Sequence, residues 1–121
     1  MPDADLTLFT QGAVFAAVGT TGQRCTTLRR IFLHEDVYDK VVPSLVAAYE
    51  SVMKNKVGDP LDSNTLYGPM HSQVGVDGYL AAVEKAKATG GEILVGGKRM
   101  DRPGLFVEPT MRGLKLACSS L

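Results

Sequence analysis

The sequence is poor in cysteine and has no excess of charge of either sign. Its 121 residues include 2 cysteines, 13 basic and 13 acidic side chains, and the formal net charge is zero. Two cysteines are too few for a disulfide framework or a zinc site, which favours a reducing compartment. The charges are interspersed, which argues against a nucleic-acid surface or a polybasic membrane patch. We expect a water-soluble protein with no metal site and no nucleic-acid or membrane partner.

Long hydrophobic runs are also missing. The longest apolar stretches are far too short to span a bilayer. Residues 1–5 are acidic, and no basic segment leads into an apolar core, so we expect neither a secretory signal nor a transit peptide. The hydrophobic fraction is nevertheless 45%, which is ordinary for a globular domain of this length.

The first half of the chain predicts a helix, a strand and a second helix. Asp3 or Asp5 can cap a helix that ends at Gly19, and residues 28–34 are typical of a strand. The second helix follows a cap at Glu35 or Asp36, and its apolar residues recur every three or four positions: Val37, Val41, Leu45, Ala48 and Val52. Pro43 interrupts this pattern, so either the helix kinks there or it starts there.

The second half predicts a loop, a third helix and two short strands. The loop covers residues 54–72, and Ser72 can cap a helix that Gly90 and Gly91 terminate. Residues 92–95 and 106–108 are typical of strands, with a turn-rich connection between them. This order of elements indicates the α/β class, with a parallel-type sheet flanked by helices.

One cysteine stands in a polar bend that begins with glycine, GQRCTT at residues 22–27. Such a bend presents a nucleophilic thiol, and neighbouring cations at Arg24, Arg29 and Arg30 favour the reactive thiolate. The alternative is that Cys25 is a small buried hydrophobic residue. The local residues alone leave both interpretations open.

Several stretches in a fixed order resemble the aldehyde dehydrogenase superfamily, most closely its antiquitin group. They are FAAVGTTGQRCTT (15–27), LRRIFLHE (28–35), VGDP (57–60), LYGP (66–69), GG (90–91), GGK (96–98), MDRPG (100–104) and FVEPT (106–110). The resemblance covers residues 3–110, which we interpret as part of a catalytic domain. Residues 111–121 do not resemble the family, and we expect them to be a divergent tail in which Cys118 has no role.

The resemblance implies an oxidoreductase that uses NAD(P). Cys25 would be the nucleophile that attacks an aldehyde to give a thiohemiacetal, and hydride transfer and hydrolysis would follow. Arg24 would bind the charged end of the substrate, α-aminoadipic semialdehyde. Intact members of the family are expected to form homo-oligomers. We expect a cytoplasmic location, with a mitochondrial one for a longer product as the alternative.

The resemblance also implies that other parts of the catalytic machinery are absent from this sequence. These are the general-base glutamate, the asparagine of the oxyanion hole, the dinucleotide-binding layer and the glutamate that holds the cofactor ribose. We expect no cofactor-binding residue here and an inactive isolated chain. The alternative function is a non-catalytic remnant or an interaction fragment with a reactive thiol.

Three further polar side chains receive structural interpretations. Gln23 could supply a second oxyanion donor, but a role in shaping the loop is favoured. His34 and His71 have no second ligand at metal-binding spacing, so a surface or packing role is favoured for both.

Overall fold

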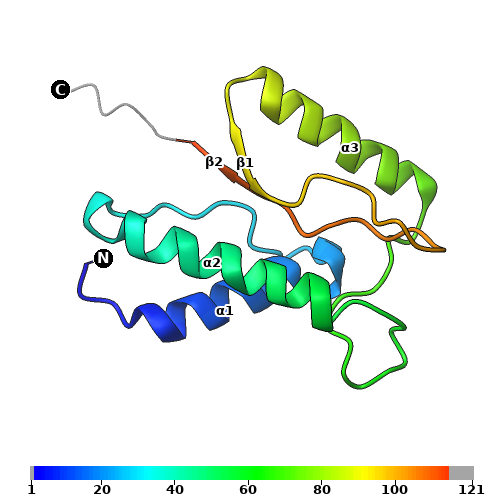
Figure 1. Cartoon of the computed structure of the whole chain (residues 1–121), viewed down its shortest axis with the longest axis horizontal. Coiled ribbons are helices and arrows are strands. Elements are labelled where there is room, and N and C mark those ends of the chain that lie inside the picture. The colour runs from blue at the N-terminus through cyan, green and yellow to red at the C-terminus, as the bar shows by residue number, and fades with distance from the viewer. Residues whose placement is uncertain (1, 115–121) are drawn as a thin grey trace.

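The structure, a computed structural model, describes residues 2–114 and contains three α-helices and a two-stranded sheet. The helices are α1 (Leu6–Val18), α2 (Glu35–Asn55) and α3 (Gln73–Ala88), and the strands are β1 (Glu92–Val95) and β2 (Met111–Gly113). Helices α1 and α2 lie side by side, and β1 contacts both α2 and α3 (Figure 1). The predicted α/β class is confirmed.

Helix α1 begins where the sequence predicted. The Asp5 carboxylate accepts hydrogen bonds from the N–H groups of Thr7 and Leu8, both at 3.0 Å. A cap of this kind stabilises a helix by about 0.5–2 kcal/mol. The helix ends at Val18, and a short turn of 3-10 type, Gly19–Gly22, follows it.

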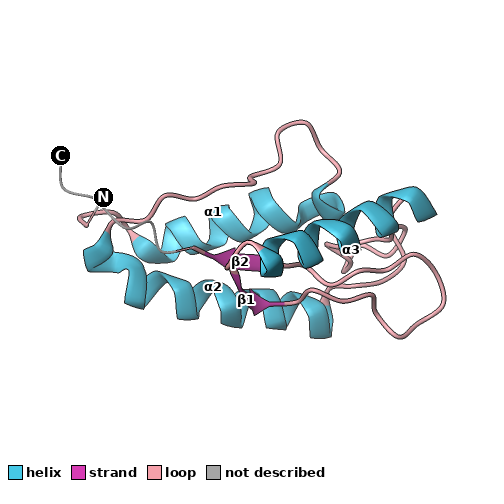
Figure 2. Cartoon of the chain, turned by 90° about the horizontal axis from the view of Figure 1, so that it is seen from above, coloured by secondary structure: helices cyan, strands magenta, loops and turns pink. Residues whose placement is uncertain are grey.

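Residues 23–34 run back along α1, so α1 and α2 point in the same direction (Figures 1 and 2). The predicted strand at residues 28–34 is wrong: this segment is extended but pairs with no strand among residues 2–114. Its Leu28 N–H instead donates to the Ala16 carbonyl of α1 at 3.0 Å. The apolar pattern reflects packing on the core by Leu28, Ile31 and Leu33, whereas Phe32 is 82% exposed.

Helix α2 begins at Glu35, one residue earlier than a cap at Glu35 would place its start and two residues earlier than a cap at Asp36 would. His34 takes the cap position, and its ring Nδ1 accepts from the Asp36 N–H at 3.2 Å. Glu35 and Asp36 therefore lie in the first turn, where their negative charges interact favourably with the helix dipole. A helix start at Pro43 is wrong, because the helix passes through that residue.

The core lies between α1, α2 and the sheet. Burial of the apolar side of α2 offsets the cost of an interior proline, which is about 3 kcal/mol. The buried core residues are Ala13, Val14, Val18, Val37, Val41, Leu45, Tyr49, Val52, Tyr67 and Val95. The predicted stripe on α2 is confirmed, except that Tyr49 is buried in place of the half-buried Ala48.

Helix α3 matches its predicted boundaries. The Ser72 hydroxyl accepts from the Gly75 N–H at 3.2 Å. At the other end Gly90 takes a left-handed conformation, with φ of +78°, which terminates the helix.

The sheet differs from the expectation in direction and position. β1 pairs with β2 antiparallel, with Glu92 opposite Gly113. No helix crosses between the two strands, and without such a crossover the chain doubles back into antiparallel pairing. The predicted strand at residues 106–108 is wrong: Val107 makes only an isolated bridge to Arg99, and Pro109 has no N–H to extend it.

The second strand falls in the segment that we expected to be a divergent tail. β2 covers Met111–Gly113 and is paired to β1. The remainder of that segment, residues 115–121 with Cys118, lies outside the described residues.

Candidate functional site

The turn before Cys25 is left-handed over three consecutive residues. The φ angles are +56° at Thr20, +58° at Thr21 and +68° at Gly22. In this region the side chain of an L-residue approaches its own carbonyl oxygen, which costs about 1–2 kcal/mol per residue other than glycine. The predicted bend with Gly22 is confirmed, but no sequence signal predicted left-handed threonines. Such strain persists where surrounding contacts fix the conformation.

Two side chains fasten this turn to residues 68–71. The Thr21 hydroxyl donates to the Gly68 carbonyl at 2.7 Å. The Gln23 Nε2 donates to the carbonyls of Thr20 and Pro69, both at 3.2 Å. The Gln23 Oε1 accepts from the His71 N–H at 3.0 Å and lies 3.1 Å from His71 Nδ1. Gln23 thus has the loop-shaping role that the sequence favoured.

Residues 68–71 are in turn held by the chain that leads to β2. The Met70 N–H donates to the Leu105 carbonyl at 2.8 Å. The buried Tyr67 hydroxyl donates to the Val107 carbonyl at 2.7 Å. Burial raises the pKa of Tyr67 above its ordinary value, because an apolar surrounding disfavours the phenolate. The turn before Cys25 is therefore connected through residues 68–71 to a buried part of the fold.

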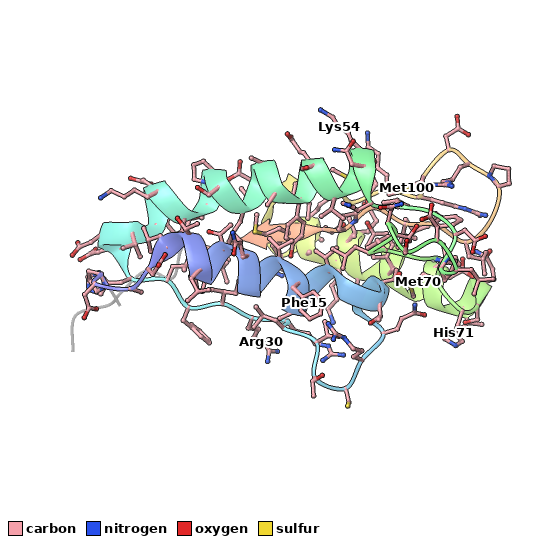
Figure 3. The ribbon with its side chains drawn as sticks, turned by 90° about the horizontal axis from the view of Figure 1, so that it is seen from below. Phe15, Arg30, Lys54, Met70, His71 and Met100 are labelled. Atoms are coloured by element: carbon pink, nitrogen blue, oxygen red, sulfur yellow. The ribbon has the colours of Figure 1, made fainter. Side chains whose placement is uncertain are left out.

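Arg24 points back to the C-terminal end of α1. Its Nη2 donates to the Phe15 carbonyl at 3.1 Å, and its guanidinium carbon lies 5.3 Å from the centre of the Phe15 ring. The Nε is buried and has no hydrogen-bond partner among residues 2–114. Gly19 makes room for this side chain, since a Cβ there would lie 2.8 Å from Nη2. Figure 3 shows Phe15 on the side of α1 that faces away from α2, with Arg30 nearby and His71 beyond the end of the helix.

Cys25 is exposed and forms no disulfide, so the alternative that it is a buried hydrophobic residue is wrong. It lies in a short turn in which the Thr27 N–H donates to the Arg24 carbonyl at 3.1 Å. The Thr27 hydroxyl accepts from the Arg24 N–H at 3.2 Å. The Arg29 guanidinium donates to the carbonyls of Arg24 and Thr27, both at 3.2 Å. Of the three predicted cations, Arg29 thus binds main-chain oxygens on both sides of Cys25, whereas the Arg24 side chain binds the Phe15 carbonyl of α1.

The histidine and acidic side chains of the described chain do not gather into a metal site. Residues 2–114 contain no group of three His, Cys, Asp or Glu side chains that could hold a metal ion. His34 caps α2, and His71 binds Gln23. Within the same residues no helix has the length and apolar character needed to cross a membrane.

Two hollows on the surface lie away from the turn. One is lined by Arg99, Met100, Asp101, Arg102 and Pro103. The other is apolar and is lined by residues of α1 and its cap together with Leu28. Neither hollow includes Cys25 or Arg24.

Known proteins resemble this chain in sequence and in fold. A family model described as "Aldehyde dehydrogenase family" matches residues 1–113. Alpha-aminoadipic semialdehyde dehydrogenase of Bos taurus is 57% identical over 109 residues, which are 90% of this chain and 20% of that relative. The chain therefore spans about a fifth of the length of this relative.

Solved structures of aldehyde dehydrogenases also resemble this chain in fold. Succinate-semialdehyde dehydrogenase from Burkholderia pseudomallei superposes with a TM-score of 0.84 and 35% identity, over 95% of this chain and 23% of the other. Betaine aldehyde dehydrogenase from Staphylococcus aureus, solved as a point mutant with NAD+ and a BME-modified cysteine, gives a TM-score of 0.81. Its identity is 36%, over 89% of this chain and 22% of the other.

Proposed function

Because this chain belongs to the aldehyde dehydrogenase family, we propose that it carries the nucleophile of an enzyme that oxidises α-aminoadipic semialdehyde to the carboxylate. The observation that carries the proposal is Cys25, which is exposed in an anchored turn within a sequence 57% identical to a dehydrogenase of that semialdehyde. The modified cysteine of the Staphylococcus aureus relative supports a reactive thiol in the family.

The chemistry assigned to Cys25 is addition to the aldehyde. The Sγ atom of the thiolate form attacks the carbonyl carbon and forms a bond to it, and the π electron pair of the carbonyl moves to the oxygen, which gives the oxyanion of a thiohemiacetal. The Cys25 N–H is the donor that we assign to this oxygen, and one preorganised donor contributes about 3 kcal/mol to such a step. Gln23 is not a second donor, because both of its N–H groups are bound to carbonyls.

Arg24 is assigned to the carboxylate of the substrate. A guanidinium binds a carboxylate through paired hydrogen bonds, which suits the acidic end of α-aminoadipic semialdehyde. One of its donors, Nη2, is bound to Phe15, and the Nε has no partner among residues 2–114. The Nε is buried, so substrate binding would use the guanidinium N–H groups that are neither buried nor bound to α1.

NAD(P) is the two-electron oxidant that we propose for the whole enzyme. Residues 2–114 do not fit a dinucleotide. The N–H groups at the start of α1 are bound by the Asp5 carboxylate, which would also repel a pyrophosphate. In the hollow lined by residues 99–103, the guanidinium groups of Arg99 and Arg102 already donate to main-chain carbonyls. We therefore derive no step through the cofactor. The homo-oligomeric state and the cytoplasmic location remain predictions.

A chimera tests the proposal. Residues 1–113 would replace the matching stretch of the Bos taurus relative, and NAD reduction would be followed with α-aminoadipic semialdehyde. We expect turnover that Cys25→Ser abolishes, whereas Thr26→Ser, a conservative change beside it, retains turnover. Turnover that survives Cys25→Ser would refute the assignment of the nucleophile. A folded but inactive chimera would favour the non-catalytic alternative.

A further inference from the structure

We propose that Gln23 and His71 form a clasp that positions the turn carrying Cys25. The inference rests on the proposed function, because it gives these residues a role only through that nucleophile. Neither residue is placed in contact with substrate. Both act through the backbone of the turn, and they are positioning residues.

The hydrogen-bonding capacity of the Gln23 amide is fully used. Its Nε2 has two N–H groups, and these donate to the Thr20 and Pro69 carbonyls. Its Oε1 has two lone pairs, and these face the His71 N–H and the His71 Nδ1. One side chain therefore links the strained residue Thr20 to the segment 68–71.

The orientation of this amide is determined by its neighbours. A carbonyl only accepts, so the atom that faces Thr20 and Pro69 must be Nε2. A backbone N–H only donates, so the atom that faces it at His71 must be Oε1. The His71 Nδ1 also faces Oε1 at 3.1 Å, and it must therefore carry a proton. The clasp thus predicts the Nδ1–H tautomer of the neutral ring.

The clasp opposes the strain of the left-handed turn. Thr20 and Thr21 take φ angles of +56° and +58°, which unconstrained threonine avoids. The Gln23 contacts hold Thr20, and the hydroxyl of Thr21 holds Gly68 alongside them. Residues 68–71 are themselves fixed through Met70 and Tyr67, so the clasp connects the turn to the buried fold.

The test uses the 121-residue chain with Cys118→Ser, which leaves Cys25 as its one thiol. Nitrogen NMR of labelled histidine reports the tautomer of His71, and amide hydrogen exchange reports the protection of its N–H. We expect the Nδ1–H tautomer in the parent. Gln23→Ala should abolish this signature and speed exchange at residue 71 by about threefold to tenfold. Gln73→Ala is the matched control, because it removes an exposed glutamine whose side chain, among residues 2–114, is bound to Asp77 alone.

Substitutions at His71 supply a second measurement that does not depend on Gln23. His71→Asn places an amide N–H near the former Nδ1, whereas His71→Gln places its amide near the former Nε2. We expect the iodoacetamide alkylation rate of Cys25 to be retained in His71→Asn. In His71→Gln and Gln23→Ala it should approach the rate of the chain unfolded in guanidinium.

Two outcomes would overturn the clasp. One is an Nε2–H tautomer in the parent, and the other is an alkylation rate that is the same in the parent, His71→Gln and Gln23→Ala. Both measurements concern the geometry of the turn and need no turnover. A failure of the clasp is therefore distinguishable from a failure of the proposed function, which the chimera tests through Cys25→Ser.

Discussion

Replacement of Thr20 and Thr21 by glycine, one at a time, measures the strain in the turn before Cys25. Each threonine holds a positive φ, +56° and +58°, and each should release about 1–2 kcal/mol when glycine replaces it. Glycine also gives the unfolded chain more freedom, which removes about 0.4–1 kcal/mol of stability. Thr20→Gly should therefore raise the free energy of unfolding by roughly 0–1.5 kcal/mol.

The two positions differ in one contact, which makes them a matched pair. Thr20 is an exposed residue, and among residues 2–114 its hydroxyl donates to the carbonyl of its neighbour Gly19 at 2.7 Å, a local bond that does not cross the fold. The Thr21 hydroxyl is half-buried and donates across the fold to Gly68 at 2.7 Å. Loss of that bond costs about 0.5–1.5 kcal/mol. Thr21→Gly should therefore be less stable than Thr20→Gly by about 1 kcal/mol.

Urea unfolding of the 121-residue chain measures both values. The comparison requires that the slope of the free energy of unfolding against urea concentration, the m-value, is the same in all variants. A shift in the midpoint then reports a change in stability alone. Thr21→Ser is the control, because it retains the hydroxyl and should keep the bond to Gly68. Equal free energies for the two glycine variants would refute the role of the Thr21 contact. A lower free energy of unfolding in Thr20→Gly would refute the claim that Thr20 is strained.

Three other predictions concern the substrate, the cofactor and pH. In the chimera, Arg24→Gln should lower kcat/KM for the acidic semialdehyde roughly tenfold to a hundredfold more than for a neutral aliphatic aldehyde, since a charge-assisted bond contributes about 1.5–3 kcal/mol. Equal losses for the two substrates would indicate that Arg24 supports Cys25 and does not bind the substrate. The 121-residue chain alone should neither bind NAD in a calorimetric titration nor reduce it with an aldehyde, and reduction that depends on Cys25 would contradict this. Burial raises the pKa of Tyr67, so its contribution to stability is present below the ordinary tyrosine value of 10.0 and is lost as pH rises above it. Between pH 9 and 11 the free energy of unfolding should fall by up to about 1.4 kcal/mol per pH unit, and it should fall less steeply in Tyr67→Phe.

Some elements were predictable because their signals are local. Asp5 and Ser72 cap α1 and α3 through N–H groups two or three residues away, so the spacing of residues is enough to identify them. The apolar period of α2 was equally clear. Its cap was not, because His34 is a less common cap than the acidic residues that follow it.

The segment 28–34 shows where a local pattern is ambiguous. Its run of apolar residues, interrupted by two arginines, predicts a strand, but a strand also requires a hydrogen-bonding neighbour, and residues 2–114 supply none beside it. The same apolar residues pack against the core instead. The predicted parallel pairing of the sheet was wrong for a related reason. The direction of a strand depends on the path of the chain between the two paired strands, and no helix crosses between β1 and β2.

The sequence by itself determined the helices, the family and the candidate nucleophile. Caps, periodicity and the GQRCTT motif all lie within short windows, where composition and spacing carry the information. Only the tertiary structure decided how Cys25 is presented. Contacts of Thr21 with Gly68 and of Gln23 with His71 join residues 47 and 48 positions apart, and they connect the left-handed turn to residues 68–71. No local rule fixes such pairs, because they meet only after the core has brought the end of α1 beside the loop that precedes α3.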